Sequence, residues 1–222
     1  MDVTSTPILS LTARGLTVRR DQRTLFGSGV DCEFLGPGLR TVHGPNGSGK
    51  STFLEVFAGL RTPSHGSLRL GAVEANDPRL RRRRRFCPSR PALFPYLSVR
   101  DHLSLYRRAL DGDTAVEFER VRRYQLTPWL DAPVRELSTG NTQKLWLLVH
   151  TVGTFDYLAL DEPSSGLDAA AQQVLHEEVH IWAKRSIIVL VDHEHAWPES
   201  LANLAIPHPA DSGGRHDTNR QR

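Results

Sequence analysis

The chain carries the run Gly44-Pro45-Asn46-Gly47-Ser48-Gly49-Lys50-Ser51-Thr52, which matches the phosphate-loop pattern G-x-x-x-x-G-K-[ST] at every fixed position. Glycines let the backbone curl closely enough for successive N–H groups to point at phosphate oxygens. Lys50 adds a mobile positive charge for the β- and γ-phosphates, and the Ser51 hydroxyl is a suitable ligand for Mg²⁺. We therefore predict that residues 44–52 bind a polyphosphate.

The residues on either side of this run support a phosphate loop. Residues 39–42 form a short strand-like run. Downstream, apolar side chains recur at helical spacing from Phe53 to Leu60, and Gly59 stands where a helix would end. In the order strand, loop, helix, the dipole of the helix adds to phosphate binding at its amino terminus. This context favours a phosphate loop over a glycine-rich turn that happens to contain a lysine.

Length and composition are those of an ordinary globular protein. The 222 residues, of which 39% are hydrophobic and 24% charged, can form one sizeable core or two small domains. No uninterrupted apolar run approaches the roughly 18 residues of a membrane span, and residues 1–10 lack a signal-peptide pattern. The two distant cysteines, Cys32 and Cys87, fit a reducing compartment better than a disulfide framework.

The charge balance is mildly basic, with a formal net charge of +3 and a pI near 9.1. This excess is too small to predict a nucleic-acid partner. The local exception is the run of arginines at residues 81–85, which we interpret as a solvated surface. The alternative is contact with an anionic neighbour, either lipid head groups or an acidic loop of a partner. Aromatic residues do not interleave with these arginines, which disfavours single-stranded nucleic acid.

Strand and helix signals divide the chain into regions. Residues 8–43 predict strands and turns, and residues 67–70 predict another strand. From residue 77 to residue 150 the pattern becomes helical. We expect one helix with Ser98 as its cap and Asp101 in its first turn, and two more over about 116–124 and 142–150.

The last third of the chain returns to alternating strands and helices. Buried strands are predicted at 157–160 and 187–191, separated by a helix whose apolar face includes Leu175 and Val179. This alternation favours a mostly parallel sheet with helices on both sides, into which the helical region is inserted. Residues beyond 209 are polar, and we expect a disordered tail there.

Two acidic residues, Asp161 and Glu162, follow the predicted strand at 157–160. Open α/β sheets bind their ligands at the carboxyl ends of their strands. Asp161 is therefore placed to hold Mg²⁺, directly or through water, across from Ser51. Glu162 would lie beside it, where it could orient or deprotonate an attacking water. The phosphate loop upstream favours this reading over a simple strand-ending turn.

Several further motifs occur in a fixed order after the phosphate loop. They are Leu137-Ser138-Thr139-Gly140-Asn141, Leu158-Ala159-Leu160-Asp161-Glu162-Pro163, Ser164-Ser165-Gly166-Leu167-Asp168, and then His193. With these motifs, residues 8–205 resemble the ATP-binding subunits of ABC transporters. The first run is similar to the family signature usually written L-S-G-G-Q, the second to its second nucleotide motif and the third to the loop that follows. His193 falls where the family has its switch histidine.

The resemblance implies a fold and a domain organisation. The expected fold class is α/β, a P-loop NTPase of the ABC type with a mostly parallel sheet core, an antiparallel β subdomain and a helical subdomain. Residues 1–208 would form a single ABC ATPase domain, with the helical subdomain inserted at about 89–150. Residues 209–222 would form the disordered tail. The short length resembles a compact exporter-type subunit more than an importer with a regulatory domain.

The resemblance also implies roles for individual residues. ATP would lie between the phosphate loop, Gly44 to Thr52, of one subunit and the signature of a second subunit that faces it head to tail. Ser138 and the backbone N–H of Gly140 would reach the γ-phosphate held by the partner, as an anion site at a helix amino terminus. Glu162 would be the general base, and His193 would hold the γ-phosphate and the water. Asp168 would communicate across the dimer.

Three positions depart from the family pattern. The family has a glutamine that contacts Mg²⁺ or water where this chain has Ser89, so water must bridge from the shorter side chain or the contact is lost. Thr139 and Asn141 replace two residues of the signature. The aromatic residue that stacks on adenine is also missing. Arg20 occupies about its place, and its guanidinium plane could stack instead, or simply be exposed.

The expected function is an ATP-hydrolysing subunit, with ATP and Mg²⁺ as cofactors, that powers a separate transmembrane permease subunit. It would dimerise with a second ATP-binding subunit, lie in the cytoplasm on the inner face of the membrane, and contact the membrane only through its partner. Residues 89–150 would carry the docking surface. The alternatives are a weakly hydrolysing partner in a heterodimer, which Ser89 keeps open, and a non-transport ABC ATPase, which the single phosphate loop and lack of a coiled coil disfavour.

Overall fold

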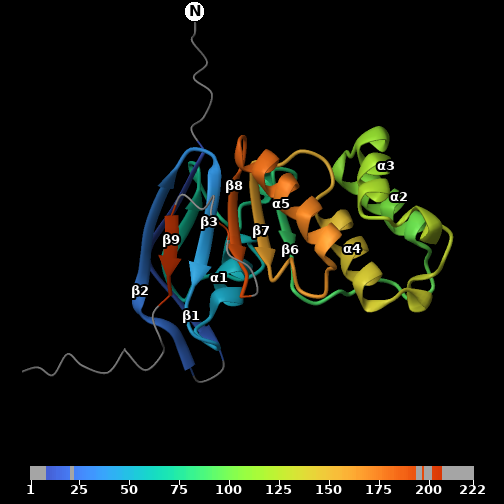
Figure 1. Ribbon diagram of the computed structural model, residues 1–222. Coiled ribbons are helices and arrows are strands. Elements are labelled where there is room, and N and C mark those ends of the chain that lie inside the picture. The colour runs from blue at the N-terminus through green and yellow to red at the C-terminus, as the bar shows by residue number, and fades with distance from the viewer. Residues whose placement is uncertain (1–8, 21–22, 194–196, 198–201, 207–222) are drawn as a thin grey trace, which may run out of the picture.

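The structure, a computed structural model, describes residues 9–20, 23–193, 197 and 202–206, without the side chains of 202 and 203. The predicted tail at 209–222 lies outside the described residues. Figure 1 shows an antiparallel sheet at one end, a parallel sheet in the middle and a group of helices at the other end. Within the described part of the chain, none of the helices has the length and apolar character that crossing a bilayer requires.

The central sheet has five parallel strands in the order β6-β7-β8-β3-β9. In that order they are Arg84–Cys87, Tyr157–Asp161, Ile187–Val191, Gly38–His43 and Ala202–Ala205. β7 and β8 are buried along their whole length, because layers of the protein cover both faces of the sheet. The predicted strands at 39–42, 157–160 and 187–191 are confirmed. β6 and β9 were not predicted.

Side chains that alternate along the strands of this sheet enter two separate cores. Leu158 and Leu160 pack in one core with helices α4 (Thr139–His150) and α5 (Ala169–Ala183). Ala159, between them, packs in the other core with α1 (Lys50–Phe57) and the antiparallel sheet. Because successive side chains of a strand point to opposite faces of the sheet, β7 contributes side chains to both cores. The predicted sheet with helices on both sides is confirmed.

The antiparallel sheet has the order β2-β1-β4-β5. Its strands, in chain order, are β1 (Ser10–Arg20), β2 (Arg23–Leu35), β4 (His65–Leu70) and β5 (Val73–Glu74). The sequence predicted strands and turns over residues 8–43, and β1 and β2 are two long strands of 11 and 13 residues within this region. Register shifts interrupt β1 between Ala13 and Leu16 and again between Leu16 and Val18. These irregularities break the alternation of apolar residues, which explains why the sequence shows only fragments of two long strands.

The helical insertion consists of α2 (Val99–Leu110), α3 (Thr114–Arg123) and α4. Ser98 and Asp101 form the expected capping box on α2, since each side chain accepts the backbone N–H of the other. All three predicted helices are confirmed: α2 follows the predicted cap, and α3 and α4 start two and three residues earlier than expected. Short 3₁₀ helices occupy Pro78–Leu80, Thr127–Trp129 and Val134–Glu136. The last two of these turns lie between α3 and α4, near Pro128 and Pro133.

The arginine run at residues 81–85 is not simply a solvated surface, so that interpretation is wrong in part. Arg81 is exposed, but Arg84 and Arg85 belong to β6, and Arg85 is only 5% exposed. The Arg85 guanidinium donates hydrogen bonds to backbone carbonyls of remote loops, including that of Val152 at 3.0 Å. Arg83 pairs with Asp156. Burial of Arg85 is tolerated because its guanidinium N–H groups donate to loop carbonyls that have no partner in a β-sheet.

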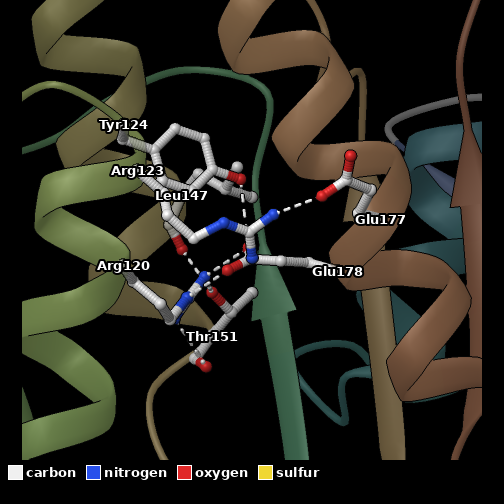
Figure 2. A network of polar contacts seen from close by, with 7 residues as sticks. All are labelled: Arg120, Arg123, Tyr124, Leu147, Thr151, Glu177 and Glu178. Atoms are coloured by element: carbon white, nitrogen blue, oxygen red, sulfur yellow. Dashed lines mark hydrogen bonds and ion pairs between the residues drawn. The ribbon is translucent and has the colours of Figure 1, made fainter.

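A buried polar network joins the helical insertion to α5 (Figure 2). Arg120 of α3 forms a two-point ion pair with Glu178 of α5, with N···O distances of 2.6 and 2.9 Å. The Tyr124 hydroxyl donates to the same carboxylate at 3.0 Å, and Arg120 also donates to the Thr151 hydroxyl at 2.7 Å. The side chains of Arg120 and Glu178 are 11% and 5% exposed. Such a pair holds two elements in one relative position, because each charge needs the other.

We predict that Glu178→Gln lowers the free energy of unfolding by about 3 kcal/mol, because it leaves the Arg120 charge buried without a counter-ion. Urea denaturation measures the effect. Glu119→Gln is the matched control, since Glu119 pairs with Arg122 on the exposed side of α3 and should cost less than about 1 kcal/mol. Equal losses in the two variants would contradict the structural role of the buried pair.

Candidate functional site

The phosphate loop lies between the end of β3 and the start of α1, as the sequence predicted. Gly49 is the residue before α1 and has a left-handed backbone, with φ 104°. Lys50 begins the helix, so the free N–H groups of its first turn point toward the loop. The arrangement gives an anion site at a helix amino terminus, backed by the helix dipole.

Gly49 also lies against the antiparallel sheet. A Cβ atom at this position would lie 2.8 Å from Cε1 of Phe26 and 3.3 Å from Cδ1 of Leu25. Phe26 is fully buried and cannot move aside freely. Position 49 therefore needs glycine twice over, for the left-handed turn and for the close approach of the ring.

The Lys50 side chain folds back over the loop. Its ammonium donates hydrogen bonds to the carbonyl oxygens of Gly44 at 2.8 Å and Pro45 at 3.0 Å. Burial lowers the pKa of Lys50, while the nearby carboxylates of Glu162 and Asp161 act in the opposite direction. The ammonium is thus held at the loop, close to the two acids that follow β7.

Asp161 ends β7 and is 4% exposed. Burial raises the pKa of its carboxyl, and hydrogen bonds from the hydroxyls of Ser51 and Ser89 partly offset that increase. Its Oδ1 is buried and has no hydrogen-bond partner in the described part of the chain. The structure thus brings together Ser51, Ser89 and Asp161, the three residues predicted as metal ligands. Their hard oxygen atoms and the orphaned Oδ1 fit Mg²⁺, which commonly binds one or two carboxylates plus phosphate oxygens.

Glu162 and His193 form a pair at the ends of the neighbouring strands β7 and β8. The Glu162 carboxylate lies 3.4 Å from Nε2 of His193 and accepts the backbone N–H of His193 at 3.3 Å. Glu162 has a left-handed backbone, with φ 52°, and its N–H donates to the carbonyl of Val191 at 2.8 Å. Burial raises the pKa of Glu162, and both interactions with His193 lower it. The carboxyl is therefore partly desolvated and oriented by the histidine.

The phosphate loop and the Glu162–His193 pair line a cavity of about 900 Å³. The lining residues are Arg20, Arg23, Leu25, Asn46, Gly47, Gly49, Lys50, Ser51, Thr52, Glu162, Val191 and His193. The predicted Arg20 is thus in the cavity with the phosphate loop and the Glu162–His193 pair. Sequence reasoning missed Arg23 and Leu25. Arg23 and Leu25 share one face of β2, because they are two residues apart in a strand. Both could have been predicted to line the cavity if the register that pairs Arg20 with Arg23 had been known.

The predicted signature residues lie elsewhere. Ser138 caps α4 and accepts the backbone N–H of Asn141 at 3.2 Å, so the run does begin a helix. Ser138 and Gly140 do not line the cavity of their own chain. A Cβ at Gly140 would lie 3.2 Å from the carbonyl of Gly166, which places the start of α4 beside the loop that follows Glu162.

Asp168 makes its contacts within its own chain. It caps α5 by accepting the N–H of Ala171 at 2.8 Å, and it pairs with Lys144 of α4 at 2.6 Å. Lys144 is 6% exposed in its side chain, and sequence reasoning missed it. No local signal identifies it, because the pair joins elements that are 24 residues apart.

The fold and this site define a phosphate-loop nucleotide hydrolase of the α/β class. The family model described as ABC transporter matches residues 37–165, which is more than half of the chain. The chain therefore belongs to the ABC transporter family, in which it is an ATP-binding ATPase domain. The fold class predicted from the sequence is confirmed.

Curated relatives and solved structures agree with this assignment. The human ATP-binding cassette sub-family A member 6 is 30% identical over 167 residues, which cover 72% of this chain and 10% of that protein. The Nod factor export ATP-binding protein I of Cupriavidus metallidurans is 32% identical over 196 residues, covering 83% of this chain and 65% of that protein. The chain thus spans about a tenth of the length of the first curated relatives it matches.

Two solved structures share the fold. One, described as the ATP-binding subunit of an ABC transporter, has a TM-score of 0.71 at 25% identity and covers 83% of this chain and 79% of its own. An ABC transporter ATP-binding protein from Pyrococcus furiosus has a TM-score of 0.73 at 20% identity, covering 88% of this chain and 97% of its own.

We predict that Gly49→Ala destabilises the protein more than Gly47→Ala. Both positions have a left-handed backbone, with φ 104° and 77°, so alanine costs about 1–2 kcal/mol at each. Only at position 49 does the new methyl group also meet a buried ring, whereas the space around Gly47 is open. Chemical denaturation compares the two variants. Phe26→Leu should recover part of the loss in the Gly49→Ala background, and a failure to do so would contradict the proposed clash.

Proposed function

We propose that this chain is the ATP-hydrolysing subunit of a transporter whose membrane-embedded part is a separate subunit. ATP would lie between the phosphate loop of one chain and the signature of a second. The observation that carries the proposal is a phosphate-loop cavity lined by Lys50, Ser51, Glu162 and His193, beside which the Asp161 carboxyl hydrogen-bonds to the Ser51 hydroxyl. This combination supports phosphoryl transfer to water, because it supplies a phosphate cradle, a metal ligand and a base.

The phosphates would be held by the loop and by Lys50. Residues 44–52 would direct backbone N–H groups at the β- and γ-phosphates, with the amino terminus of α1 behind them. In this structure the Lys50 ammonium donates hydrogen bonds to the carbonyls of Gly44 and Pro45, close to where the phosphates would lie. Exchange of those carbonyls for phosphate oxygens would need only a small movement of the ammonium.

Ser51, Asp161 and Ser89 would hold Mg²⁺, which when bound neutralises charge on the transferred phosphoryl group. Ser89 replaces the glutamine expected at its position. Its hydroxyl nevertheless hydrogen-bonds to the Asp161 carboxyl. This contact supports a function for Ser89 in orienting Asp161, although a serine lacks the reach of the longer amide.

Glu162 would accept the proton of the attacking water, while His193 would orient the carboxylate and hold the γ-phosphate. The pair is supported by its geometry, in which one carboxylate contacts both the imidazole and the backbone N–H of His193. Partial desolvation makes Glu162 a better base than an exposed carboxylate, because its pKa moves toward the working pH.

A second copy or a homologous subunit would complete the site. Ser138 and Gly140 begin the 12-residue helix α4, whose amino terminus suits a γ-phosphate, yet they do not line the cavity of their own chain. A head-to-tail pair would bring each signature to the other chain's phosphate loop. Asp168, beside this surface, would then act across the dimer while tied to Lys144.

The membrane-embedded partner would dock on the helical insertion. Phe94 and Tyr96 follow Ser89 closely in the chain and are 58% and 76% exposed. Leu97 and Leu105 add further exposed apolar surface, at 37% and 48%. Adjacent apolar side chains of this size mark a protein contact more often than a solvated surface. The chain would thus work in the cytoplasm, on the inner face of the membrane, and reach the membrane only through this partner.

We predict that Glu162→Gln lowers kcat for ATP hydrolysis about 10²–10⁴-fold and leaves ATP binding intact, because glutamine keeps the shape but cannot accept the proton. Steady-state assays with Mg-ATP measure the rate, and size-exclusion chromatography should show a dimer trapped by ATP. Glu74→Gln, an exposed glutamate in β5, is the control. Turnover of Glu162→Gln at the parent rate would contradict the assignment. ATP binding by the parent without turnover or dimer would instead indicate an obligate heterodimer.

We predict an acid limb in the pH profile of kcat above the ordinary carboxyl value of 4.5, because burial raises the pKa of Glu162. The ionised form is the active one, so kcat falls as the pH falls through this raised pKa. His193→Gln removes an interaction that lowers the pKa of Glu162, so the limb should move to still higher pH. An unchanged limb in His193→Gln would show that another group controls it. Profiles at saturating Mg-ATP test both points.

A further inference from the structure

One carboxylate bridges the two loops that carry the Glu162–His193 pair. Asp192 follows β8 and comes directly before His193. Its Oδ2 accepts a hydrogen bond from the Ser164 hydroxyl at 2.6 Å and another from the indole N–H of Trp197 at 3.2 Å. Ser164 belongs to the loop that begins at Glu162, and Trp197 comes after His193 in the chain. The Asp192 side chain therefore connects the chain beyond β7 with the chain beyond β8.

The hydrogen bond from Ser164 to Asp192 is of the strong, charge-assisted kind. A separation of 2.6 Å is typical of a hydroxyl that donates to an ionised carboxylate. Ser164 is fully buried, so water does not compete for its hydroxyl. In surroundings of low dielectric such a bond is stronger than it would be in water. It therefore restrains residue 192 and the backbone on either side of it.

Trp197 is itself anchored to the body of the protein. Its ring stacks on the imidazole of His176 in α5, with centroids 4.1 Å apart and planes inclined by 9°. Trp197 is also part of the core that contains α4 and α5, and it is 8% exposed. The indole N–H thus reaches Asp192 from a fixed support. Asp192 is held from two directions, by the loop after β7 and by α5 through Trp197.

The backbones of Glu162 and His193 differ in how firmly they are held. Glu162 donates its N–H to the carbonyl of Val191 at 2.8 Å, and its own carbonyl accepts the N–H of Ser165 at 3.2 Å. His193 lies beyond the last register pair of β7 and β8, and 49% of its side chain is exposed. Its two polar contacts with the described residues both go to Glu162 and are long, at 3.3 and 3.4 Å. The position of the imidazole therefore depends on the residues beside it in the chain.

We propose that Asp192 is a positioning residue that holds His193 against the Glu162 carboxylate. It does so by tying the backbone before the histidine to Ser164 and Trp197. This inference rests on the proposed roles of Glu162 and His193 in ATP hydrolysis. Asp192 does not line the nucleotide cavity, so its loss leaves the phosphate loop in place. ATP should then bind as before, while the histidine no longer meets the γ-phosphate and the carboxylate in one fixed geometry.

A double-mutant cycle tests this coupling. Asp192→Ala removes both hydrogen bonds and should lower kcat for ATP hydrolysis about 10- to 100-fold, as expected when a catalytic group is displaced by about 1 Å. KM should stay within about twofold of the parent. In the His193→Gln background the same replacement should lower kcat by less than about threefold, because the group that it positions is already gone. Glu33→Ala, which removes an exposed carboxylate paired with Arg14, is the control and should change neither parameter.

A second variant separates the hydrogen bond from the charge. Ser164→Ala leaves the Asp192 carboxylate in place and removes the shorter of its two hydrogen bonds. It should lower kcat at least about threefold, again with KM unchanged. A rise in KM of more than about tenfold in either variant would overturn the proposal, because Asp192 would then act on nucleotide binding. An effect of Asp192→Ala on kcat that persists undiminished in the His193→Gln background would also overturn it.

The imidazole nitrogen resonances of His193 in NMR spectra give a readout that does not require turnover. They are assigned by their absence in His193→Gln. They should shift in Asp192→Ala and in Ser164→Ala but not in Glu33→Ala, and unchanged resonances in the first two variants would overturn the proposal. A parent chain that does not hydrolyse ATP would instead refute the proposed function, and the resonances would still decide whether Asp192 positions His193.

Discussion

The nucleotide site depends on one close contact, between the backbone of Gly49 and the buried ring of Phe26. Gly49 ends a loop that starts from the parallel sheet, whereas Phe26 belongs to the antiparallel sheet. The contact leaves no room for a side chain at position 49, so the loop approaches β2 as closely as a backbone can. It therefore fixes the distance from the phosphate loop to the strands that line the other end of the cavity. The cavity therefore has two chemically different ends, the phosphate loop at one and Arg20 and Arg23 of the antiparallel sheet at the other.

The charged groups of the site are held in an environment that burial makes unfavourable for each of them. Burial lowers the pKa of Lys50 and raises those of Asp161 and Glu162. Their mutual attraction and the nearby hydroxyls offset only part of this cost, and Oδ1 of Asp161 has no hydrogen-bond partner in the described residues. A ligand with both negative phosphates and a divalent cation complements Lys50 and Asp161 at once. Binding of that ligand should therefore stabilise the folded chain as well as prepare the reaction.

Much of the fold could be predicted because its signals are local. The phosphate loop, the capping box of Ser98 and Asp101 and the strands β7 and β8 each depend on residues close together in the chain. β6 was missed because a run of arginines indicates solvent exposure. Arg85 is buried only because carbonyls as distant as that of Val152 accept its hydrogen bonds, and no sequence pattern records such partners.

The residues of the site likewise fall into those that local motifs reveal and those that depend on distant parts of the chain. Lys50, Asp161 and Glu162 belong to motifs whose chemistry is visible in the sequence. In the structure Lys50 and Glu162 line one cavity, and Asp161 lies close to both. Arg23 depends on the register between β1 and β2, and Lys144 on the packing of α4 against α5. Register and packing are tertiary properties, so residues that act through them can be recognised only when the neighbouring element is in place.

The helical insertion and the acidic end of β7 are mechanically connected through α5. Lys144, in the first half of α4, pairs with Asp168 at the start of α5, and Arg120 of α3 pairs with Glu178 further along the same helix. Asp168 also ends the loop that begins at Glu162. A displacement of Ser138 at the start of α4 must therefore either break the Lys144–Asp168 pair or carry that loop with it. Because the Lys144 ammonium is almost completely buried, breaking the pair would leave a charge without a counter-ion, which is the costlier alternative. The surface that would face a second subunit is thus coupled, inside a single chain, to the residues that surround the phosphates.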